Sequence, residues 1–448
     1  MSVDAMAESL NFPNQKRRAV ASRSYRVKIS PNNGQNFTAG QTVNIDMPSN
    51  LAGTYVNWNQ CYLKFKATST GAGKLDRCGA AGFISRVQCQ TAGAQIFDLP
   101  NWNVLMTILM DGDSSPAYKA GVGNILLGTK GGCQEGETLL SGVARTFCVP
   151  FVLHPFGMST PHRLMPLFSS SPVQFKITLE SYANATKGAT TALAFEEVEL
   201  VCVFTELSPG AQAQVDQMSG GIYNILAASY QNVGTSMDAG ARSLTANLGI
   251  SVSSLERIIV CHRPNSSLNA VGAFSLGNRA KNQLEQYSIF INGEQYPARP
   301  VIIENACAEA LAEYLLSDHS LVNFDKQSSF NIAVASNTSV KSNGIDGGSV
   351  VGIFEPYSEE TPAGTESGST ANTGSNIGSF ITGVELETGL SDGRSQRLYS
   401  GVSTISSTVN YRGVYAANAV AAQLDFFCQF TVLLSLNSRG TNVWSVSV

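Results

Sequence analysis

The chain contains little charge. Only 14% of its 448 residues are Asp, Glu, Lys or Arg, against roughly 25% in an average soluble protein. The formal net charge of −4 excludes a global basic field that would draw the whole chain to nucleic acid. Because a monomer depends on surface charge for solubility, this composition is typical of a protein that covers much of its surface by assembly. Some secreted β-proteins share the composition, so that class stays open.

The sequence also lacks long apolar runs and targeting signals. No stretch of 18 or more apolar residues occurs, so no membrane-spanning helix is predicted. The N-terminus does not show the charged and then apolar layout of a secretory signal. Together with the unpaired cysteines described next, these absences lead us to expect a protein that is made inside a cell.

The nine cysteines are odd in number and include no CxxC pair. Several of them, such as Cys89, Cys202, Cys261 and Cys428, fall within apolar strand-like patterns. Such cysteines behave as small apolar residues, and intracellular proteins keep them reduced. The pattern predicts free, buried thiols rather than a disulfide framework.

Motifs that carry chemistry are scarce. The four histidines are His154, His162, His262 and His319, and they form neither HExxH nor another metal-ligand spacing. A G-x-S-x-G nucleophile motif is absent. Scattered acidic residues give no support to a carbohydrate-active enzyme, which needs paired carboxylates. We expect structural histidines, no metal and no cofactor, and we do not expect an enzyme.

Two polar stretches resemble ligand loops only superficially. Asp111 and Asp113 are two nearby carboxylates, but the further ligands of a twelve-residue calcium loop are missing. We interpret them as the end of a helix. The glycine-rich stretch Gly121–Gly132 places Thr129 before Lys130, the reverse of the order in a phosphate-binding loop. We interpret that stretch as a surface loop.

One layout occurs twice in the sequence. A strand pattern, a turn at Gly93 and a second strand pattern are followed by an apolar helix-like stretch at 103–110. The same order returns around Gly293, 200 residues later, with a helical pattern after it. The two halves also end alike, because 201–208 is similar to 428–435. We predict two β-domains of one kind in tandem, which favours a building block over a catalyst.

Short alternating patterns between these landmarks indicate antiparallel β-structure. The cleanest one places Val173, Phe175, Ile177 and Leu179 in alternation with polar residues. Period-two runs of five to seven residues with Gly, Asn or Pro at their ends are typical of half-buried strands. The predicted class is all-β, with short helices in the connections.

Composition divides the chain into segments. Residues 1–25 are predicted to form an N-terminal arm, and 26–210 the first β-domain. The polar stretch 211–221, which ends in two glycines, is the predicted linker. The second domain is then 222–448, and within it 358–379 is so rich in Gly, Ser, Thr, Asn and Pro that we expect an exposed loop.

The predicted arm and the residues after it are basic. No acidic residue occurs between Ser9 and Ile45. The basic residues that crowd together there are Lys16, Arg17, Arg18, Arg23, Arg26 and Lys28. One interpretation is a solvated terminus, and the other is a basic arm, Lys16–Lys28, that contacts nucleic acid or anionic lipid headgroups.

Several stretches together carry a resemblance to a known family. They are the early strand pair at 43–48 and 62–65, the strand-turn-strand-helix unit at 83–111, the approach to a strand at 145–180, and the closing strand at 198–209. The layout resembles the double jelly-roll major capsid proteins of icosahedral DNA viruses, whose lineage includes tailless membrane-containing phages, adenoviruses, virophages and polinton-like viruses. The resemblance covers nearly the whole chain as a pattern and contains no diagnostic motif.

This resemblance implies two tandem antiparallel jelly-roll sandwiches, each made of two packed sheets. It implies a major capsid protein that forms pseudo-hexameric homotrimers, which tile an icosahedral virion shell. The implied partners are neighbouring capsomers, penton and minor capsid proteins, and the genome or an inner membrane through the N-terminal arm. The alternative is a secreted or surface β-sandwich adhesin, which the unpaired cysteines and the missing signal disfavour.

Overall fold

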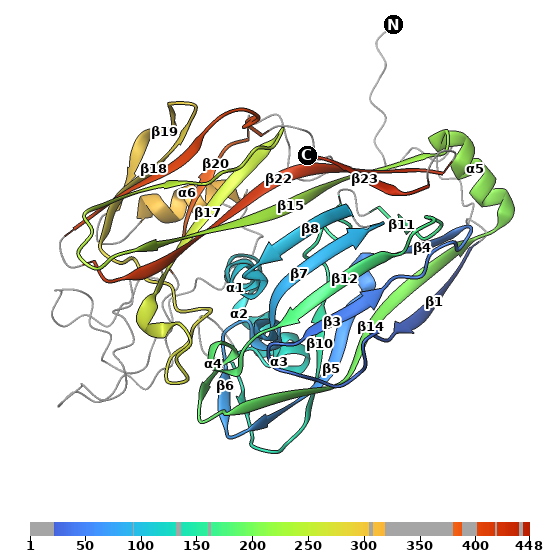
Figure 1. Ribbon diagram of the computed structural model, residues 1–448, viewed down its shortest axis with the longest axis horizontal. Coiled ribbons are helices and arrows are strands. Elements are labelled where there is room, and N and C mark those ends of the chain that lie inside the picture. The colour runs from blue at the N-terminus through green and yellow to red at the C-terminus, as the bar shows by residue number, and fades with distance from the viewer. Residues whose placement is uncertain are drawn as a thin grey trace, which may run out of the picture.

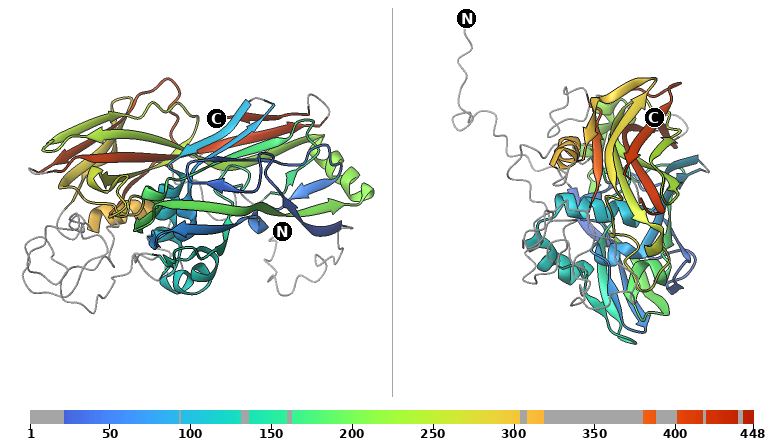
Figure 2. Two further views of the ribbon diagram at one scale, coloured as in Figure 1. Left: turned by 60° about the horizontal axis from the view of Figure 1, so that its bottom comes forward. Right: turned by 90° about the vertical axis from the view of Figure 1, so that its left-hand side faces the viewer.

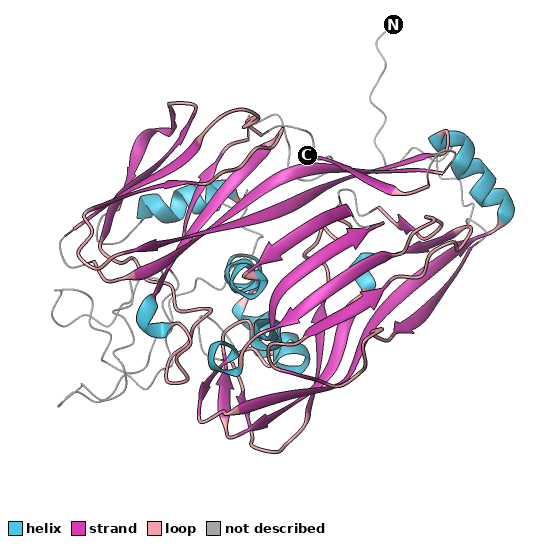
Figure 3. Cartoon of the chain, viewed as in Figure 1, coloured by secondary structure: helices cyan, strands magenta, loops and turns pink. Residues whose placement is uncertain are grey.

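The computed structural model describes residues 22–92, 94–130, 136–159, 163–303, 308–318, 380–387, 401–416, 419–438 and 442–448. The predicted exposed loop 358–379 lies outside these residues, and so do residues 1–21 with Lys16, Arg17 and Arg18. Within the described part, the chain forms two β-sandwiches (Figure 1, Figure 3).

The first sandwich has eight principal strands, which are β1 Ser22–Ile29, β3 Thr42–Asp46, β5 Tyr62–Thr70, β7 Ile84–Thr91, β8 Ala94–Pro100, β10 Arg145–Pro150, β12 Val173–Leu179 and β14 Ala192–Leu207. One sheet has the order β1-β14-β5-β10, and the other has the order β3-β12-β7-β8. All of these pairs are antiparallel.

In the described part of the second sandwich there are eight corresponding strands, which are β15 Ile222–Met237, β16 Ser243–Asn247, β17 Leu255–Pro264, β18 Leu284–Ile291, β19 Glu294–Ile302, β20 Thr382–Glu385, β21 Val409–Tyr415 and β22 Ala422–Asn437. One sheet has the order β15-β22-β17-β20, and the other has the order β16-β21-β18-β19. A ninth strand, β23 (Trp444–Ser447), pairs with β22.

The two sandwiches have the same topology. If the eight principal strands are numbered along each half, the two sheets have the orders 1-8-3-6 and 2-7-4-5 in both halves. Helix α1 (Trp102–Asp113) follows the fifth strand of the first half, and α6 (Ala308–Ser317) follows the fifth strand of the second. The predicted tandem duplication is therefore confirmed, and each half is a jelly roll.

Short elements fill the connections. The small strands are β2 Phe37–Thr38, β4 Thr54–Val56, β6 Gly73–Leu75, β9 Thr138–Leu139, β11 Met165–Pro166 and β13 Thr186–Gly188. The remaining α-helices are α2 Pro116–Ala120, α3 Val122–Leu127, α4 Tyr182–Ala185 and α5 Pro209–Ser219. The 3-10 turns are η3 Trp58–Gln60, η4 Gly79–Phe83 and η5 Asn265–Ser267.

Side-chain alternation explains why the sheets can pack face to face. Along β12, Val173, Phe175, Ile177 and Leu179 are buried and the residues between them are half-buried, as the sequence pattern predicts. Strand β17 is buried along its whole length, which is typical of a central strand with both faces covered. Alternating burial on two facing sheets produces the core of each sandwich.

The structure corrects two predictions about connections and boundaries. The stretch Gly121–Gly132 is not simply a surface loop, because 122–127 forms helix α3. The predicted arm 1–25 is too long, because β1 begins at Ser22 and pairs along its length with β14.

The stretch that we predicted as the linker, 211–221, carries most of helix α5. The Ser208 hydroxyl caps this helix by accepting a hydrogen bond from the amide of Ala211, and Pro209 occupies its first turn. The helix ends at Gly220, whose φ of 64° lies in the left-handed region that favours glycine. A defined helix therefore joins the last strand of the first jelly roll to the first strand of the second.

Candidate functional site

The candidate site is the junction between the two jelly rolls, because the sequence predicts a protein whose function is association. The two jelly rolls lie side by side, with β8 of the first next to β15 of the second (Figure 1, Figure 2). Asn101, directly after β8, donates a hydrogen bond from Nδ2 to Oδ1 of Asn232 in β15 (3.2 Å). The amide of Ala228 in β15 donates to the carbonyl of Met158 in the first jelly roll (3.3 Å).

Aromatic contacts extend this junction. The rings of Phe168 and Tyr223 meet edge to face with centroids 4.9 Å apart, and those of Phe156 and Trp444 meet at 5.1 Å. In each pair the first residue belongs to the first jelly roll and the second residue to the second. Such pairs add about 0.5–1.5 kcal/mol beyond the burial of their area.

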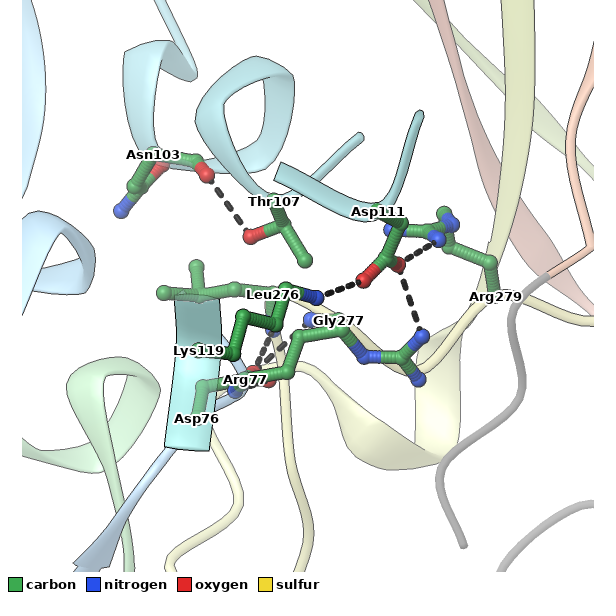
Figure 4. Close-up of polar contacts among 9 residues, drawn as sticks. All are labelled: Asp76, Arg77, Asn103, Thr107, Asp111, Lys119, Leu276, Gly277 and Arg279. Atoms are coloured by element: carbon green, nitrogen blue, oxygen red, sulfur yellow. Dashed lines mark hydrogen bonds and ion pairs between the residues drawn. The ribbon is translucent and has the colours of Figure 1, made fainter. Parts of the chain in front are cut away.

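A buried carboxylate lies at the centre of the junction. Asp111, near the end of α1, accepts hydrogen bonds from Nη1 of Arg77 and from Nζ of Lys119, both at 2.8 Å. It also forms an ion pair with Nη2 of Arg279, which belongs to the second jelly roll. All four side chains have zero solvent exposure. Figure 4 shows how the three cations surround Asp111. One anion therefore binds cations from both halves of the chain.

The electrostatics favour the charged form of Asp111. Burial opposes its ionisation, but attraction by Lys119, Arg77 and Arg279 outweighs burial and holds the pKa of this carboxyl well below its usual value. Stability from the ionised form is therefore present above the ordinary pKa of an aspartate and is lost only in strong acid.

A second aspartate joins the halves through backbone groups. Asp76 accepts hydrogen bonds from the amides of Leu276 (3.1 Å) and Gly277 (2.8 Å) in the second jelly roll. Burial raises the pKa of Asp76, although Arg77 and the amide of Gly277 act in the opposite direction. Asp76 and Asp111 thus connect the same loop of the second jelly roll to two places in the first.

A further buried ion pair lies beside the β8 contact. Arg263 and Asp425, both in the second jelly roll, pair at 2.7 Å. Asn101 of the first jelly roll also donates from Nδ2 to Asp425 (3.1 Å). Asn101 has a φ of 52°, a conformation that asparagine tolerates better than most residues.

An open groove of about 350 Å³ runs along the meeting line of β8 and β15. Its lining residues come from both jelly rolls and include Gln95, Phe97, Asp98, Ser229, Gln231 and Asn232. Among the described residues, no group of three or more His, Cys, Asp or Glu side chains is placed to hold a metal ion. The groove is thus a feature of the domain contact, and we assign no ligand to it.

The structure places three of the predicted basic residues on a strand. Arg23 pairs with Glu206 at 2.7 Å, and Lys28 pairs with Glu199 at 3.1 Å. Arg26 lies between them on β1, exposed. Arg23, Arg26 and Lys28 therefore lie on a strand of the first sheet and not on a free arm. Their contact with nucleic acid or a membrane stays a prediction. The other three, Lys16, Arg17 and Arg18, lie outside the described residues.

The described histidines are buried, and so are all the described cysteines except Cys148, which is half-buried. His154 and His262 are fully buried, and burial lowers the pKa of each to about 3. The free cysteines among the described residues are Cys61, Cys78, Cys89, Cys148, Cys202, Cys261 and Cys428. In this part of the chain no helix is long and apolar enough to cross a membrane.

Comparison with known proteins gives structural matches alone. No family model and no curated protein matches the chain. The capsid of the virus PBCV-1 matches with a TM-score of 0.60 at 12% identity, over 97% of this chain and 98% of that one. The Faustovirus major capsid protein matches with a TM-score of 0.58 at 10% identity, over 94% and 91% of the two chains.

The chain has the double jelly-roll fold. The mavirus major capsid protein shares it with a TM-score of 0.50 at 10% identity, over 100% of this chain and 96% of that one. Because the matches extend over nearly the full length of both chains, they include both jelly rolls and their order.

Sequence reasoning missed the residues that hold the double jelly roll together. The sequence indicates Asp111 as the end of a helix, and no pattern in it distinguishes Arg77, Lys119 or Arg279 from other basic residues. One signal in the sequence does indicate a buried ion pair. Asp111 lies at the end of an apolar helical run, and a charge that is buried there needs a partner. The identity of its partners could not be read from the sequence, because two of them are 34 and 168 residues away.

Proposed function

We propose that this protein is a major capsid protein that assembles into the shell of an icosahedral virion. The observation that carries the proposal is the duplicated jelly roll itself, with two sandwiches of one topology fixed side by side by buried ion pairs. The structural matches to viral capsid proteins over nearly the full chain support it.

The assembly unit we propose is a homotrimer with a pseudo-hexameric outline. Two similar jelly rolls in each chain give six similar units around a threefold axis. Units with a hexagonal outline can cover a surface with only a few kinds of contact between neighbours. Closed symmetry is also the usual state of homo-oligomers. The low charge of the chain fits a protein that buries surface in such contacts.

The partners we propose follow from that role. They are neighbouring capsomers of the same protein, with penton and minor capsid proteins at special positions of the shell. We also propose that Lys16, Arg17 and Arg18 contact the genome or an inner membrane, because three adjacent cations bind polyanions in a salt-dependent way.

Sedimentation and light scattering of the purified protein test this proposal. A capsid protein of this kind should have a mass of about 140 kDa, three times the 47.5 kDa of one chain. At higher concentration it should form hexagonally ordered sheets or shells. A protein that stays monomeric at every concentration would contradict the proposal. No observation on this structure favours the adhesin alternative.

A further inference from the structure

Two cysteines of the first jelly roll lie opposite each other on neighbouring strands. The antiparallel pairing of β5 with β14 runs as far as Tyr62 opposite Val201. One position further along the same register, Cys61 lies opposite Cys202. Directly opposite residues of antiparallel strands have Cα atoms about 4.5–5.5 Å apart. This separation is within the range of about 4.4–6.8 Å that a disulfide spans.

The two side chains are in contact inside the core. Only 3% of Cys61 and none of Cys202 is exposed, and both thiols are free. The Cys202 thiol donates a hydrogen bond to the sulfur of Cys61. The Cys61 thiol in turn donates to the carbonyl of Asn57 (3.1 Å). The two sulfur atoms are therefore already within reach of each other in the reduced protein.

The environment gives the two thiols different reactivity. The hydrogen bond from Cys202 lowers the pKa of Cys61 and outweighs the effect of burial, whereas the same hydrogen bond and burial both raise the pKa of Cys202. Burial raises the pKa of every other cysteine that the structure describes. Because the thiolate is the nucleophile in thiol–disulfide exchange, Cys61 is the better attacking group of the pair.

Access to the pair is through the 3-10 turn η3. Cys61 directly follows this turn, and its amide donates to the carbonyl of Trp58 (3.0 Å). The two residues between them, Asn59 and Gln60, are exposed. A single turn at the surface opens at a much lower free energy than a whole domain unfolds. A small solute can therefore reach Cys61 while the sandwich stays folded.

We propose that Cys61 and Cys202 are a redox-active pair, which closes into a disulfide between β5 and β14 when the folded protein meets a small-molecule disulfide such as oxidised glutathione. The Cys61 thiolate attacks one sulfur of that molecule, forms a mixed disulfide and releases the other half as a thiolate. Cys202 then attacks the sulfur of Cys61, and its proton passes to the second departing thiolate. The two protein thiols are thereby oxidised, and one small disulfide is reduced to two thiols.

The disulfide would enclose most of the first jelly roll, because β5 and β14 are its third and eighth principal strands. A link across so long a loop restricts the unfolded chain, so we expect oxidation to raise the melting temperature by about 5–15 °C. Thiols stay reduced inside cells and are oxidised outside them. In a capsid protein the pair would stabilise the shell after it leaves the cell, although the thiol chemistry itself does not depend on that role.

Alkylation and peptide mass spectrometry test the pair. The full-length protein is purified in reducing buffer, incubated in its folded state with oxidised glutathione, and then denatured and alkylated. We expect peptides joined through Cys61 and Cys202, alkylation of the other described cysteines, and a rise in melting temperature that reduction reverses. Alkylation of both Cys61 and Cys202 after the incubation would overturn the inference, and so would a link from either residue to a third cysteine.

Single variants test the order of attack. Cys202→Ser should stop at the mixed disulfide, with one glutathione on Cys61, whereas Cys61→Ser should take up no glutathione at Cys202. The matched control is Cys89→Ser, which removes another buried thiol of the same jelly roll and should form the Cys61–Cys202 link as the wild-type protein does. Circular dichroism shows that each variant is folded, and an alanine variant replaces any serine variant that is not. Glutathione on Cys202 in Cys61→Ser would contradict the proposed roles.

Mass measurement of the same samples separates this inference from the proposed function. A trimer in which Cys61 and Cys202 do not link contradicts the redox pair and leaves the capsid proposal standing. A protein that forms the link but stays monomeric at every concentration supports the pair and contradicts the capsid proposal.

Discussion

Asp111 and Arg279 form a fully buried ion pair between the two jelly rolls, and Asp111 also binds Arg77 and Lys119. A buried charge is costly to desolvate, so it is tolerated only where its partners are complete. The cluster draws on both halves of the chain, and rotation of one jelly roll against the other would break it. We interpret it as the contact that fixes the relative orientation of the two jelly rolls.

Removing the negative charge of Asp111 should destabilise the contact between the two jelly rolls strongly. Asp111→Asn leaves three buried cations without their anion, and we expect a loss of about 3–5 kcal/mol in the free energy of unfolding. Urea denaturation followed by tryptophan fluorescence measures it. The matched control is Asp98→Asn, which breaks the more exposed pair with Arg86 and should cost about 0–1 kcal/mol. Equal losses in the two variants would show that the cluster has no special role.

Acid should destabilise the protein through its buried histidines. The pKa of His154 and of His262 is lowered to about 3 by burial, whereas in the unfolded chain a histidine titrates near pH 6.5. Between these values the unfolded state binds protons that the folded state does not. The free energy of unfolding should therefore fall as the pH drops below about 6.5, by up to ~1.4 kcal/mol per pH unit for each histidine.

Denaturation between pH 5 and about 6.5 tests this effect, because carboxylates of ordinary pKa remain ionised there. The double variant His154→Asn/His262→Asn should show a much smaller slope than the wild-type protein. An unchanged slope would mean that other groups cause the acid sensitivity.

A pair of glycines provides a test of close packing at η4. Gly79 has a φ of +60°, and a Cβ atom there would lie 2.2 Å from the carbonyl oxygen of Leu127. Gly40 has a φ of +82° and nothing within 4 Å of the same position. Both Ala variants adopt a left-handed conformation at a cost of about 1–2 kcal/mol.

Gly79→Ala must also displace backbone, which adds about 1–3 kcal/mol. We therefore expect its melting temperature to fall well below that of Gly40→Ala, as differential scanning calorimetry would show. Similar melting temperatures would contradict the close approach of η4 and α3.

Two deletions distinguish the role of the basic N-terminal residues from the role of strand β1. Removing 1–21 should leave the melting temperature and the oligomer mass unchanged and should weaken salt-dependent binding to DNA or to anionic vesicles. Removing 1–29 also takes away β1, which pairs with β14 along eight residues. That deletion should lower the melting temperature and prevent trimer formation. Full polyanion binding after removal of 1–21 would contradict the role proposed for Lys16, Arg17 and Arg18.

Local patterns predicted much of the fold. The alternation along 173–179 and the 200-residue offset between Gly93 and Gly293 identified the strands and the duplicated hairpins, because these signals depend on neighbours in the sequence. The basic residues of β1 were assigned to an arm because charge alone does not distinguish a solvated terminus from an edge strand. Their partners, Glu206 and Glu199, are more than 170 positions away, and only tertiary packing brings them together.

Negative-stain electron microscopy of the purified full-length protein tests the central claim most directly, namely that a duplicated jelly roll associates with copies of itself. The account predicts six-lobed, hexagonal class averages from particles of about 140 kDa, three chains of 47.5 kDa each. Particles the size of a single chain, or rings with a number of lobes other than six, would contradict it.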